Sequence, residues 1–353
     1  MNHISKIRGL FDAADIDAIL LTSPVSQRYA VGYAFSDGYV LITGSAAYLV
    51  TDFRYLEEAE KLTDPEITVV APSSMLEFIE GTLIGDGAGR IGYEDRALTC
   101  ADFARIFEDL PGVAVPIGGG IEDLRAVKDS SEIAMIRMAQ SITDAAYQHI
   151  LKTLTPSMTE VDVVLELEFF MRRAGAEGIA FPTIAVSGAS SALPHGLPSR
   201  NTLSRGFLTM DFGAMYGGYC SDMTRTVSLG KATPEMKRLY ETVRHAQELG
   251  IEAIAAGIEG HLVDGAARSF IDSQGYAGLF GHSFGHGVGL EIHEAPRLSS
   301  RSSIPLAAGN VVTAEPGIYR IGEYGCRIEN MGLVTEDGFE NFTASSTELL
   351  ELF

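Results

Sequence analysis

Two stretches in the last third of the chain hold most of its candidate chemistry and decide its fold. The first is GHSFGHGVGLEIHEAP, residues 281–296, and the second is VVTAEPGIYRIGEYGCRIEN, residues 311–330. Together they place three histidines, all in the first stretch, and several glutamates among glycines, and these are residue types that bind metals and transfer protons. The candidates are His282, His286, His293, Glu315 and Glu329.

The second stretch has a counterpart upstream, MDFGAMYGGYCSDM, residues 210–223. Each copy has an acid at the end of an apolar run, a glycine two residues later, a tyrosine, a glycine turn, a cysteine and a second acid. The apolar runs 206–210 and 310–314 fit strands that enter hairpins. We therefore expect an internal duplication in which each half contributes two carboxylates, Asp211 and Asp222 from the first and Glu315 and Glu329 from the second.

Four carboxylates that converge on one place repel one another and would take up protons unless cations neutralise them. With one imidazole they form an oxygen-rich donor set, which favours Mn²⁺ or Co²⁺ over a thiolate-type zinc site. The set has too many donors for one tetrahedral zinc but enough for two metals that share carboxylates. Two metals about 3.5–4 Å apart can activate water and polarise a carbonyl group. A single aspartate in a turn is usually a surface or capping residue, but the repetition in two modules favours a dinuclear metal site.

A competing motif is Gly281-His-Ser-Phe-Gly285, which matches the G-x-S-x-G turn of serine hydrolases. That fold needs an acid and then a histidine well downstream of the serine, whereas the only histidines after Ser283 are His286 and His293. We therefore disfavour a serine nucleophile. The remaining histidines outside glycine-rich contexts are interpreted as structural; they are His3, His149, His245 and His261.

Composition narrows the class of protein further. The 353 residues suggest two domains, and the hydrophobic content of 46% allows a sizeable core. The net charge of −21 disfavours nucleic acid as a partner, because phosphate binding needs clustered Lys and Arg. No apolar run reaches the roughly 18 residues that a membrane span needs. Three cysteines and a start without a signal-like segment indicate the cytoplasm.

The order of periodic segments predicts an α/β unit over residues 1–124 and a second domain over 125–353. In the first unit we expect a strand at 17–22 and a hairpin formed by 39–43 and 47–51. In the second, capping residues predict helices that begin at Asp129, at Thr159 or Glu160, and at Thr233-Pro234, and a further helix over 263–275.

At these residues the sequence resembles the aminopeptidase P / prolidase branch of the creatinase-like, or pita-bread, metallopeptidases. The matching motifs are SGASSALPHGLPS (187–199), MDFG (210–213), YCSDMTRT (219–226), HSFGHGVGLEIHEAP (282–296), TAEPGIY (313–319) and RIEN (327–330). The stretches RYAVGYAFSDGYVLI (28–42) and LVTDFRYLEEA (49–59) resemble the N-terminal domain of bacterial Xaa-Pro aminopeptidases. The resemblance implies an α/β N-terminal domain and an α+β pita-bread catalytic domain with an internal pseudo-two-fold duplication.

The resemblance also implies the metal ligands. Asp211 would chelate one metal, Asp222 and Glu329 would bridge two, and His286 and Glu315 would complete the second. Glu315 would in addition carry the proton from water to the leaving amine. The metals implied are two divalent ions, most simply Mn²⁺, with Co²⁺ or Zn²⁺ as alternatives.

Five further residues take catalytic or substrate-binding roles through the resemblance. His293 would contact the scissile peptide, His195 would line the pocket and assist proton transfer, and His282 would shape the pocket. Arg327 matches the arginine beside the last ligand, and Tyr319 matches a tyrosine after the EPG turn.

The activity that the resemblance implies is hydrolysis of the bond between an N-terminal residue and a following proline. The N-terminal motifs favour an Xaa-Pro aminopeptidase, and an Xaa-Pro dipeptidase (prolidase) is the alternative. Methionine aminopeptidases usually lack this N-terminal domain, and an inactive peptide-binding module is a remote possibility. The family also leads us to expect a homodimer.

Overall fold

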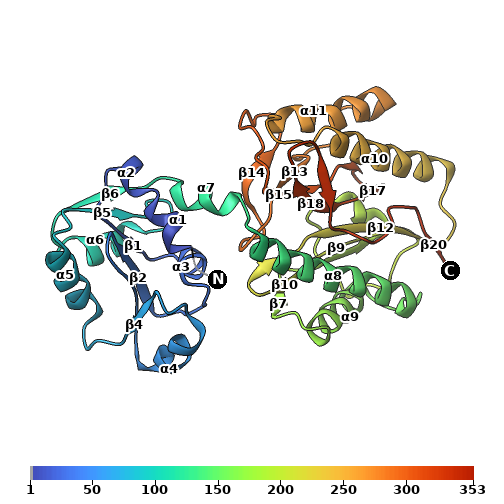
Figure 1. Ribbon diagram of the computed structural model, residues 1–353. Coiled ribbons are helices and arrows are strands. Elements are labelled where there is room, and N and C mark those ends of the chain that lie inside the picture. The colour runs from blue at the N-terminus through green and yellow to red at the C-terminus, as the bar shows by residue number, and fades with distance from the viewer. Residues whose placement is uncertain (1–2) are drawn as a thin grey trace. The chain divides into compact units, whose positions relative to one another are not determined.

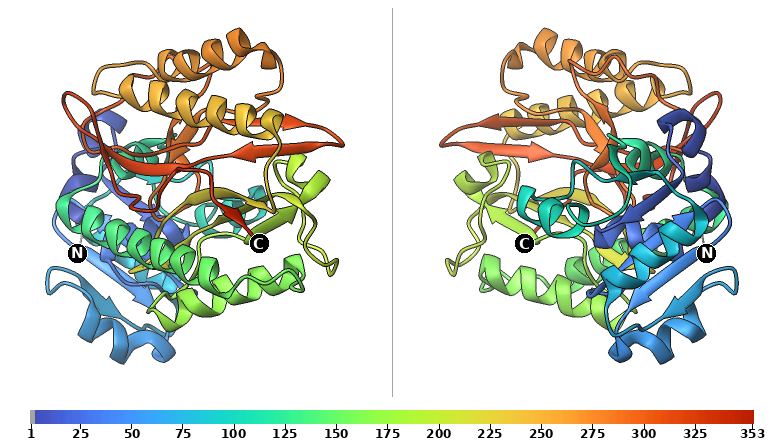
Figure 2. Two further views of the ribbon diagram at one scale, coloured as in Figure 1. Left: turned by 90° about the vertical axis from the view of Figure 1, so that its right-hand side faces the viewer. Right: turned by 90° about the vertical axis from the view of Figure 1, so that its left-hand side faces the viewer.

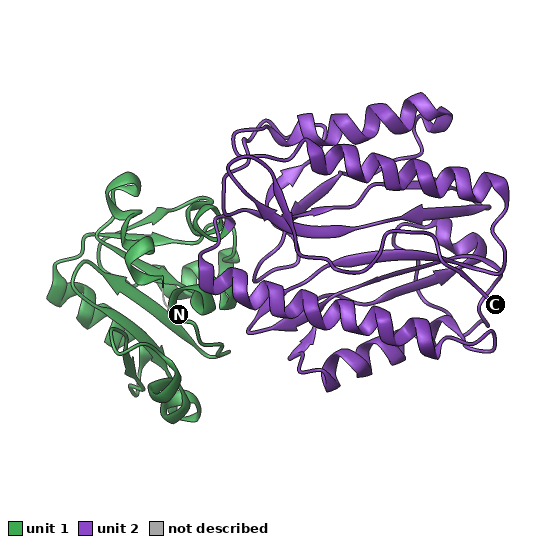
Figure 3. Cartoon of the chain, turned by 45° about the vertical axis from the view of Figure 1, so that its right-hand side comes forward, with its two compact units in different colours: residues 1–125 green, residues 126–353 purple. Residues whose placement is uncertain are grey.

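A computed structural model describes residues 3–353 of the chain. The chain forms two compact units, Met1–Arg125 and Ala126–Phe353 (Figure 3). Each unit has its own apolar core. No helix in the described part of the chain is long and apolar enough to cross a membrane.

The first unit is built on a six-stranded sheet in the order β4-β3-β2-β1-β5-β6 (Figure 1). The buried strand β1 (Ala18–Leu21) lies between β2 (Gly38–Thr43), which is antiparallel to it, and β5 (Arg90–Tyr93), which is parallel. The pairing of β2 with β3 (Ala47–Thr51) confirms the predicted hairpin. The remaining strands and helices are β4 (Thr68–Val70), β6 (Val113–Pro116), α1 (Ile4–Arg8), α2 (Phe11–Ala14), α3 (Pro24–Val31), α4 (Phe53–Leu62), α5 (Met75–Asp86), α6 (Cys100–Phe107) and α7 (Gly120–Ala126).

The helices of the second unit begin where the capping residues predict. In α8 (Ser130–Thr153) the side chain of Asp129 accepts hydrogen bonds from the first turn, and Glu132 completes a capping box. Thr159 caps α9 (Glu160–Arg173), and Thr233 caps α10 (Pro234–Glu252) with proline at the first helical position. The fourth helix, α11 (Gly260–Ile271), begins one turn earlier than its apolar periodicity predicts and continues as a π-turn over Asp272–Tyr276.

Between the two pairs of helices lie the strands of the second unit (Figure 2). One sheet has the order β20-β12-β9-β8, and another has the order β14-β13-β15-β18-β19. Two smaller sheets have the orders β11-β10-β7 and β16-β17. The strands are β7 (Gly178–Ile179), β8 (Ile184–Ser187), β9 (Gly206–Phe212), β10 (Ala214–Tyr216), β11 (Tyr219–Cys220), β12 (Met223–Leu229), β13 (Gly285–Gly287), β14 (Glu294–Leu298), β15 (Val311–Ala314), β16 (Gly317–Arg320), β17 (Tyr324–Arg327), β18 (Asn330–Val334), β19 (Phe339–Asn341) and β20 (Glu351–Leu352).

The predicted duplication is present in this topology. In the first half β9 pairs antiparallel with β12, and the excursion between them contains β10 and β11. In the second half β15 pairs with β18 in the same way, and the excursion contains the hairpin β16–β17. A pair of helices precedes each set, α8 and α9 in the first half and α10 and α11 in the second.

Strand alternation places the candidate site residues on one face of the second set. Because successive side chains point to opposite faces of a strand, odd and even positions separate. Even-numbered residues pack in the core formed with α10 and α11; they are Val312, Ala314, Ile318, Cys326 and Ile328. The odd-numbered residues Glu315, Arg327 and Glu329 line a cavity on the opposite face.

Candidate metal centre

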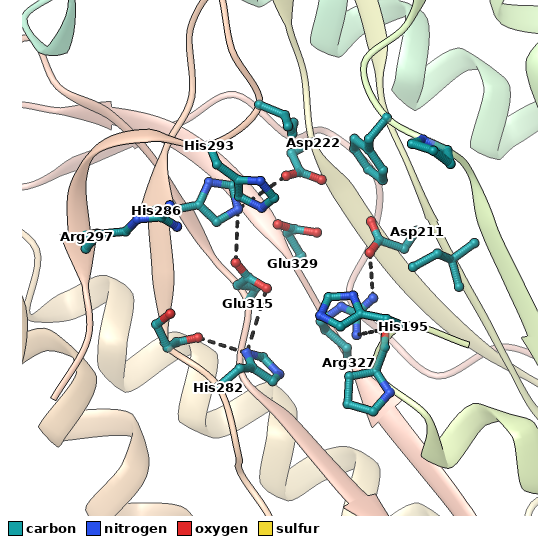
Figure 4. A pocket seen from close by; sticks show the side chains of 16 residues that line it. His195, Asp211, Asp222, His282, His286, His293, Arg297, Glu315, Arg327 and Glu329 are labelled. Carbon is teal, nitrogen blue, oxygen red and sulfur yellow. Dashed lines mark hydrogen bonds and ion pairs between the residues drawn. The ribbon is translucent and has the colours of Figure 1, made fainter. Parts of the chain in front are cut away.

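A cavity of about 340 Å³ in the second unit collects the predicted site residues (Figure 4). All of them except Tyr319 lie in its wall: His195, Asp211, Asp222, His282, His286, His293, Glu315, Arg327 and Glu329. Tyr319 lies behind the wall, where its hydroxyl is 2.8 Å from Arg327 Nη1 and 2.9 Å from His282 Nε2.

The floor of the cavity is formed by the candidate ligands Asp211, Asp222, His286, Glu315 and Glu329. Three of these residues present ligand atoms to a common point. Asp222, His286 and Glu329 are buried, and their donor atoms lie within 4.8 Å of one another. His286 Nε2 is 3.6 Å from Asp222 Oδ2 and 3.2 Å from Glu315 Oε1, while its Nδ1 is 3.1 Å from the carbonyl oxygen of Gly287. A proton on Nδ1 donates to that carbonyl and leaves the Nε2 lone pair directed at the carboxylates, which is the arrangement of a metal-binding histidine.

A glycine allows β13, which contains His286, to lie close to β15, which precedes Glu315. A Cβ atom on Gly285 would lie 2.1 Å from the carbonyl oxygen of Thr313, so β13 can run this close to β15 only without a side chain there. The close approach places the backbone N–H of His286 3.1 Å from the hydroxyl of Thr313, next to Glu315.

The charges of the floor are not balanced by the protein alone. Burial raises the pKa of Asp222, and the charges of Glu329 and Asp211 raise it further. Burial and the charge of Glu315 likewise raise the pKa of Glu329. Burial also acts to raise the pKa of Glu315, but when His286 is protonated on Nε2 as well, its hydrogen bond and charge outweigh burial and lower the pKa of Glu315 to about 2.

A second observation also favours a cation site. The Oδ1 atom of Asp211 is buried and has no hydrogen-bond partner among residues 3–353. Leaving a buried polar atom unpaired costs about 1–3 kcal/mol, and more for a charged group. Four carboxylates, one of which has an unpaired buried oxygen, and one imidazole fit divalent cations that prefer oxygen ligands.

Two threonines that the sequence patterns did not single out orient two of the candidate ligands. Thr224 Oγ1 donates to Glu329 Oε2 over 2.7 Å and accepts from Arg327 Nε over 3.0 Å. Thr313 Oγ1 donates to Glu315 Oε1 over 3.1 Å. Each threonine is two residues from a ligand of its own half, Asp222 or Glu315, so the two-residue periodicity of strands is the signal that could have found them.

The rim of the cavity is more exposed than its floor and contains His195, His293 and Arg297. The rings of His286 and His293 are 4.3 Å apart. Burial lowers the pKa of His293, and His286 and Arg297 lower it further. Burial also lowers the pKa of His282, so both imidazoles are neutral near pH 7.

An apolar wall completes the cavity. It consists of Phe181, Pro182, Ile184, Pro194 and Ile292. None of these residues could be assigned to the site from the sequence, because an isolated apolar side chain gives no signal of which cavity it will face.

A buried carboxylate–imidazole set on a duplicated α+β fold, with neutral histidines beside it, defines the class as a metal-dependent hydrolase. The chain belongs to metallopeptidase family M24: the model of that family matches residues 134–336, and the Creatinase/Prolidase N-terminal domain matches residues 3–127. These matches confirm the predicted family and the pita-bread fold of the catalytic domain.

Similar proteins match over nearly the whole chain. The structure of an Xaa-Pro dipeptidase from Bacillus anthracis is 42% identical with a TM-score of 0.95, and covers 99% of each chain. That of an X-Pro aminopeptidase from Thermotoga maritima is 36% identical with a TM-score of 0.92, over 97% of this chain and 99% of the other. The Xaa-Pro dipeptidase of Pyrococcus furiosus is 35% identical over 99% of both chains.

Proposed function

We propose that this peptidase hydrolyses Xaa-Pro bonds with two divalent metal ions, and that Xaa-Pro dipeptides are its preferred substrates. The similarity to dipeptidases over 99% of the chain carries this proposal. It favours the dipeptidase alternative of the sequence analysis over the aminopeptidase interpretation that was placed first. The similarity to the Thermotoga maritima aminopeptidase keeps the aminopeptidase as the second candidate.

A positively charged side chain in the cavity wall supports the proposal of a dipeptidase. Arg297 on β14 lies in the same cavity as the ligands, and its charge is one of those that lower the pKa of His293. A dipeptide has a free carboxylate only about 7 Å from its amino end, given roughly 3.3–3.6 Å per extended residue. A guanidinium suits the recognition of that carboxylate. In a longer peptide an uncharged amide takes this position, so an aminopeptidase gains less from the arginine.

Five residues would hold the metals: Asp211, Asp222, His286, Glu315 and Glu329. Bound divalent cations supply Lewis acidity toward the substrate carbonyl and lower the pKa of water, and we propose Mn²⁺ because the donors are mostly oxygens. Phe181, Ile184 and Ile292 offer an apolar surface for the proline ring.

Proton transfer is assigned to the protein's own side chains. Glu315 accepts a proton from the attacking water and delivers it to the leaving amine, as a second role beside metal binding. His293, neutral near pH 7, donates a hydrogen bond to the oxygen that becomes negative in the transition state. His195 assists from the opposite side of the cavity, while His282 and Tyr319 keep the pocket in shape. Arg327 holds Asp211 in place.

The deciding experiment uses full-length, metal-depleted protein reloaded with Mn²⁺. Ala-Pro, Ala-Pro-Ala and Ala-Pro amide are offered in parallel, and products are identified by mass spectrometry. A dipeptidase cleaves Ala-Pro with a kcat/KM at least about tenfold above that for the tripeptide (about 1.4 kcal/mol in transition-state binding). Faster release of alanine from the tripeptide would instead establish the aminopeptidase.

A variant tests the carboxylate contact separately. Arg297→Met should lower kcat/KM for Ala-Pro about tenfold or more and leave that for Ala-Pro amide nearly unchanged. Arg173→Met, which removes an exposed arginine from the last turn of α9, is the matched control. An equal loss on both substrates would contradict a role in binding the carboxylate. A homodimer is also proposed from the family resemblance, and light scattering on the purified protein tests it.

A further inference from the structure

One buried side chain contacts the backbone beside two of the metal ligands at once. Gln247 on α10 is 2% exposed. Its amide nitrogen donates to the carbonyl oxygen of Ala314 over 2.8 Å and to that of Ile328 over 3.1 Å. These residues immediately precede Glu315 and Glu329, which come from different strand connections of the second half.

These hydrogen bonds fix two peptide planes, because the other side of each plane is also bonded. The plane that contains the Ala314 carbonyl also contains the N–H of Glu315, which donates to the carbonyl oxygen of Phe284 over 2.8 Å. The plane that contains the Ile328 carbonyl contains the N–H of Glu329, which donates to the carbonyl oxygen of Thr224 over 3.0 Å. Each glutamate therefore begins from a peptide unit that is held at both of its polar atoms.

Packing alone does not explain a glutamine at this place. Val243, one helical turn before Gln247 on α10, and Ala246, directly before it, belong to the apolar core beneath the helix. A buried amide is costly unless it is hydrogen-bonded, so an apolar residue would be the simpler choice there. Gln140 on α8 is a buried glutamine of the other half, and its amide nitrogen contacts Asp144 at 3.4 Å and the Met223 sulfur at 3.9 Å. The double contact to ligand-bearing backbone is thus a property of Gln247.

We propose that Gln247 is a positioning residue that sets the separation of Glu315 and Glu329 and so prepares the pair to bind metal. This inference deepens the proposed function, since it rests on the assignment of these glutamates as ligands. The two carboxylates repel each other in the absence of a cation, and the fixed peptide planes keep them from moving apart. Gln247 itself touches neither metal nor substrate.

The test is a calorimetric titration of the metal-depleted, full-length protein with Mn²⁺. Gln247→Met removes both donors and keeps the length of the side chain. We expect its Mn²⁺ dissociation constant to rise about 10–100-fold, the usual effect of losing a residue that orients a ligand. At saturating Mn²⁺ kcat for Ala-Pro should still be lowered, while KM changes less than about twofold.

Gln140→Met is the matched control, because it removes a buried glutamine from the other half. It should bind Mn²⁺ as the wild type does. Wild-type Mn²⁺ affinity in Gln247→Met would overturn the proposal, and so would a variant that only lowers the melting temperature of the metal-free protein. If Gln247→Met does not fold, Gln247→Asn replaces it in the same titration. This variant keeps the amide but retracts it by one methylene group, out of reach of the two carbonyl oxygens. A wild-type protein that binds Mn²⁺ but cleaves no Xaa-Pro peptide would contradict the proposed function and leave this test of Gln247 intact.

Discussion

Arg327 Nη2 lies 2.5 Å from Asp211 Oδ2, and the two side chains come from the two halves of the duplicated domain. The guanidinium also donates to the hydroxyl of Tyr319 and to the carbonyl oxygen of Pro194. Since arginine keeps its charge under all ordinary conditions, it compensates one oxygen of Asp211 permanently. The other oxygen, Oδ1, has no hydrogen-bond partner among residues 3–353, which is why we expect it to bind a cation.

Replacing this arginine should weaken the metal centre without removing a ligand. In Arg327→Met, Asp211 loses its fixed orientation, and we expect Mn²⁺ affinity and kcat/KM each to fall about 10–100-fold. Arg327→Lys should recover part of the loss, because it restores the charge but not the forked geometry. Arg320→Met, on the same β16–β17 hairpin, is the control. Full activity in Arg327→Met would show that Asp211 needs no partner.

Measuring the metal content of variants should distinguish the residues that bind metal from the acid–base residues. His286→Ala and Glu329→Ala should each lose bound metal and activity together, since both side chains belong to the floor where the donor atoms converge. His293→Ala should keep its metal and lose rate by roughly 10²–10³-fold, the usual effect of removing one oxyanion donor. Metal content by mass spectrometry, measured beside kcat, distinguishes the two groups. Loss of metal from His293→Ala would mean that His293 is a ligand.

The hydroxyl of Thr224 should matter more than its methyl group. Thr224→Val removes the hydrogen bond to Glu329 and the acceptor for Arg327 at nearly constant volume, and we expect Mn²⁺ affinity to fall roughly tenfold. Thr224→Ser keeps the hydroxyl and should stay close to wild type. A Thr224→Val protein with unchanged affinity would show that Glu329 is held well enough by its backbone alone.

The stability of the metal-free protein should depend on pH in the direction opposite to that of an ordinary ion-paired carboxylate. Folding raises the pKa values of Asp222 and Glu329, so the folded state binds more protons than the unfolded state above the ordinary carboxylate pKa. The stability contributed by these groups is therefore lost as pH rises through their folded-state pKa values. Metal binding requires the deprotonated carboxylates and should reverse this loss.

Thermal unfolding with and without Mn²⁺ between about pH 5 and pH 8 measures the effect. The increase in melting temperature on adding Mn²⁺ should grow with pH. Asp222→Asn should make the metal-free protein more stable near pH 8 and remove most of the gain from Mn²⁺. A gain that is the same at every pH would contradict the raised pKa values of this pair.

Local patterns in the sequence were sufficient for the helix starts, the hairpin and the duplication. Asp129, Thr159 and Thr233 cap helices because a capping side chain acts on the first turn beside it, within a few residues. The two acid-containing modules repeat a strand–turn–strand pattern that is legible in the same short range. The candidate ligands could also be chosen from the sequence, because the capacity of His and Glu side chains to bind metal is a property of the residue type.

Only the tertiary structure decided which side chains support those ligands. Gln247 reaches Ala314, 67 positions away, and Thr224 reaches Glu329, 105 positions away. A contact over such a distance depends on how helices and strands pack, and a glutamine or threonine has no local feature that predicts it. The same holds for Arg297 and the apolar wall. The motifs are shared by aminopeptidases and dipeptidases, whereas the groups that we propose for binding the far end of a substrate are brought together only by folding.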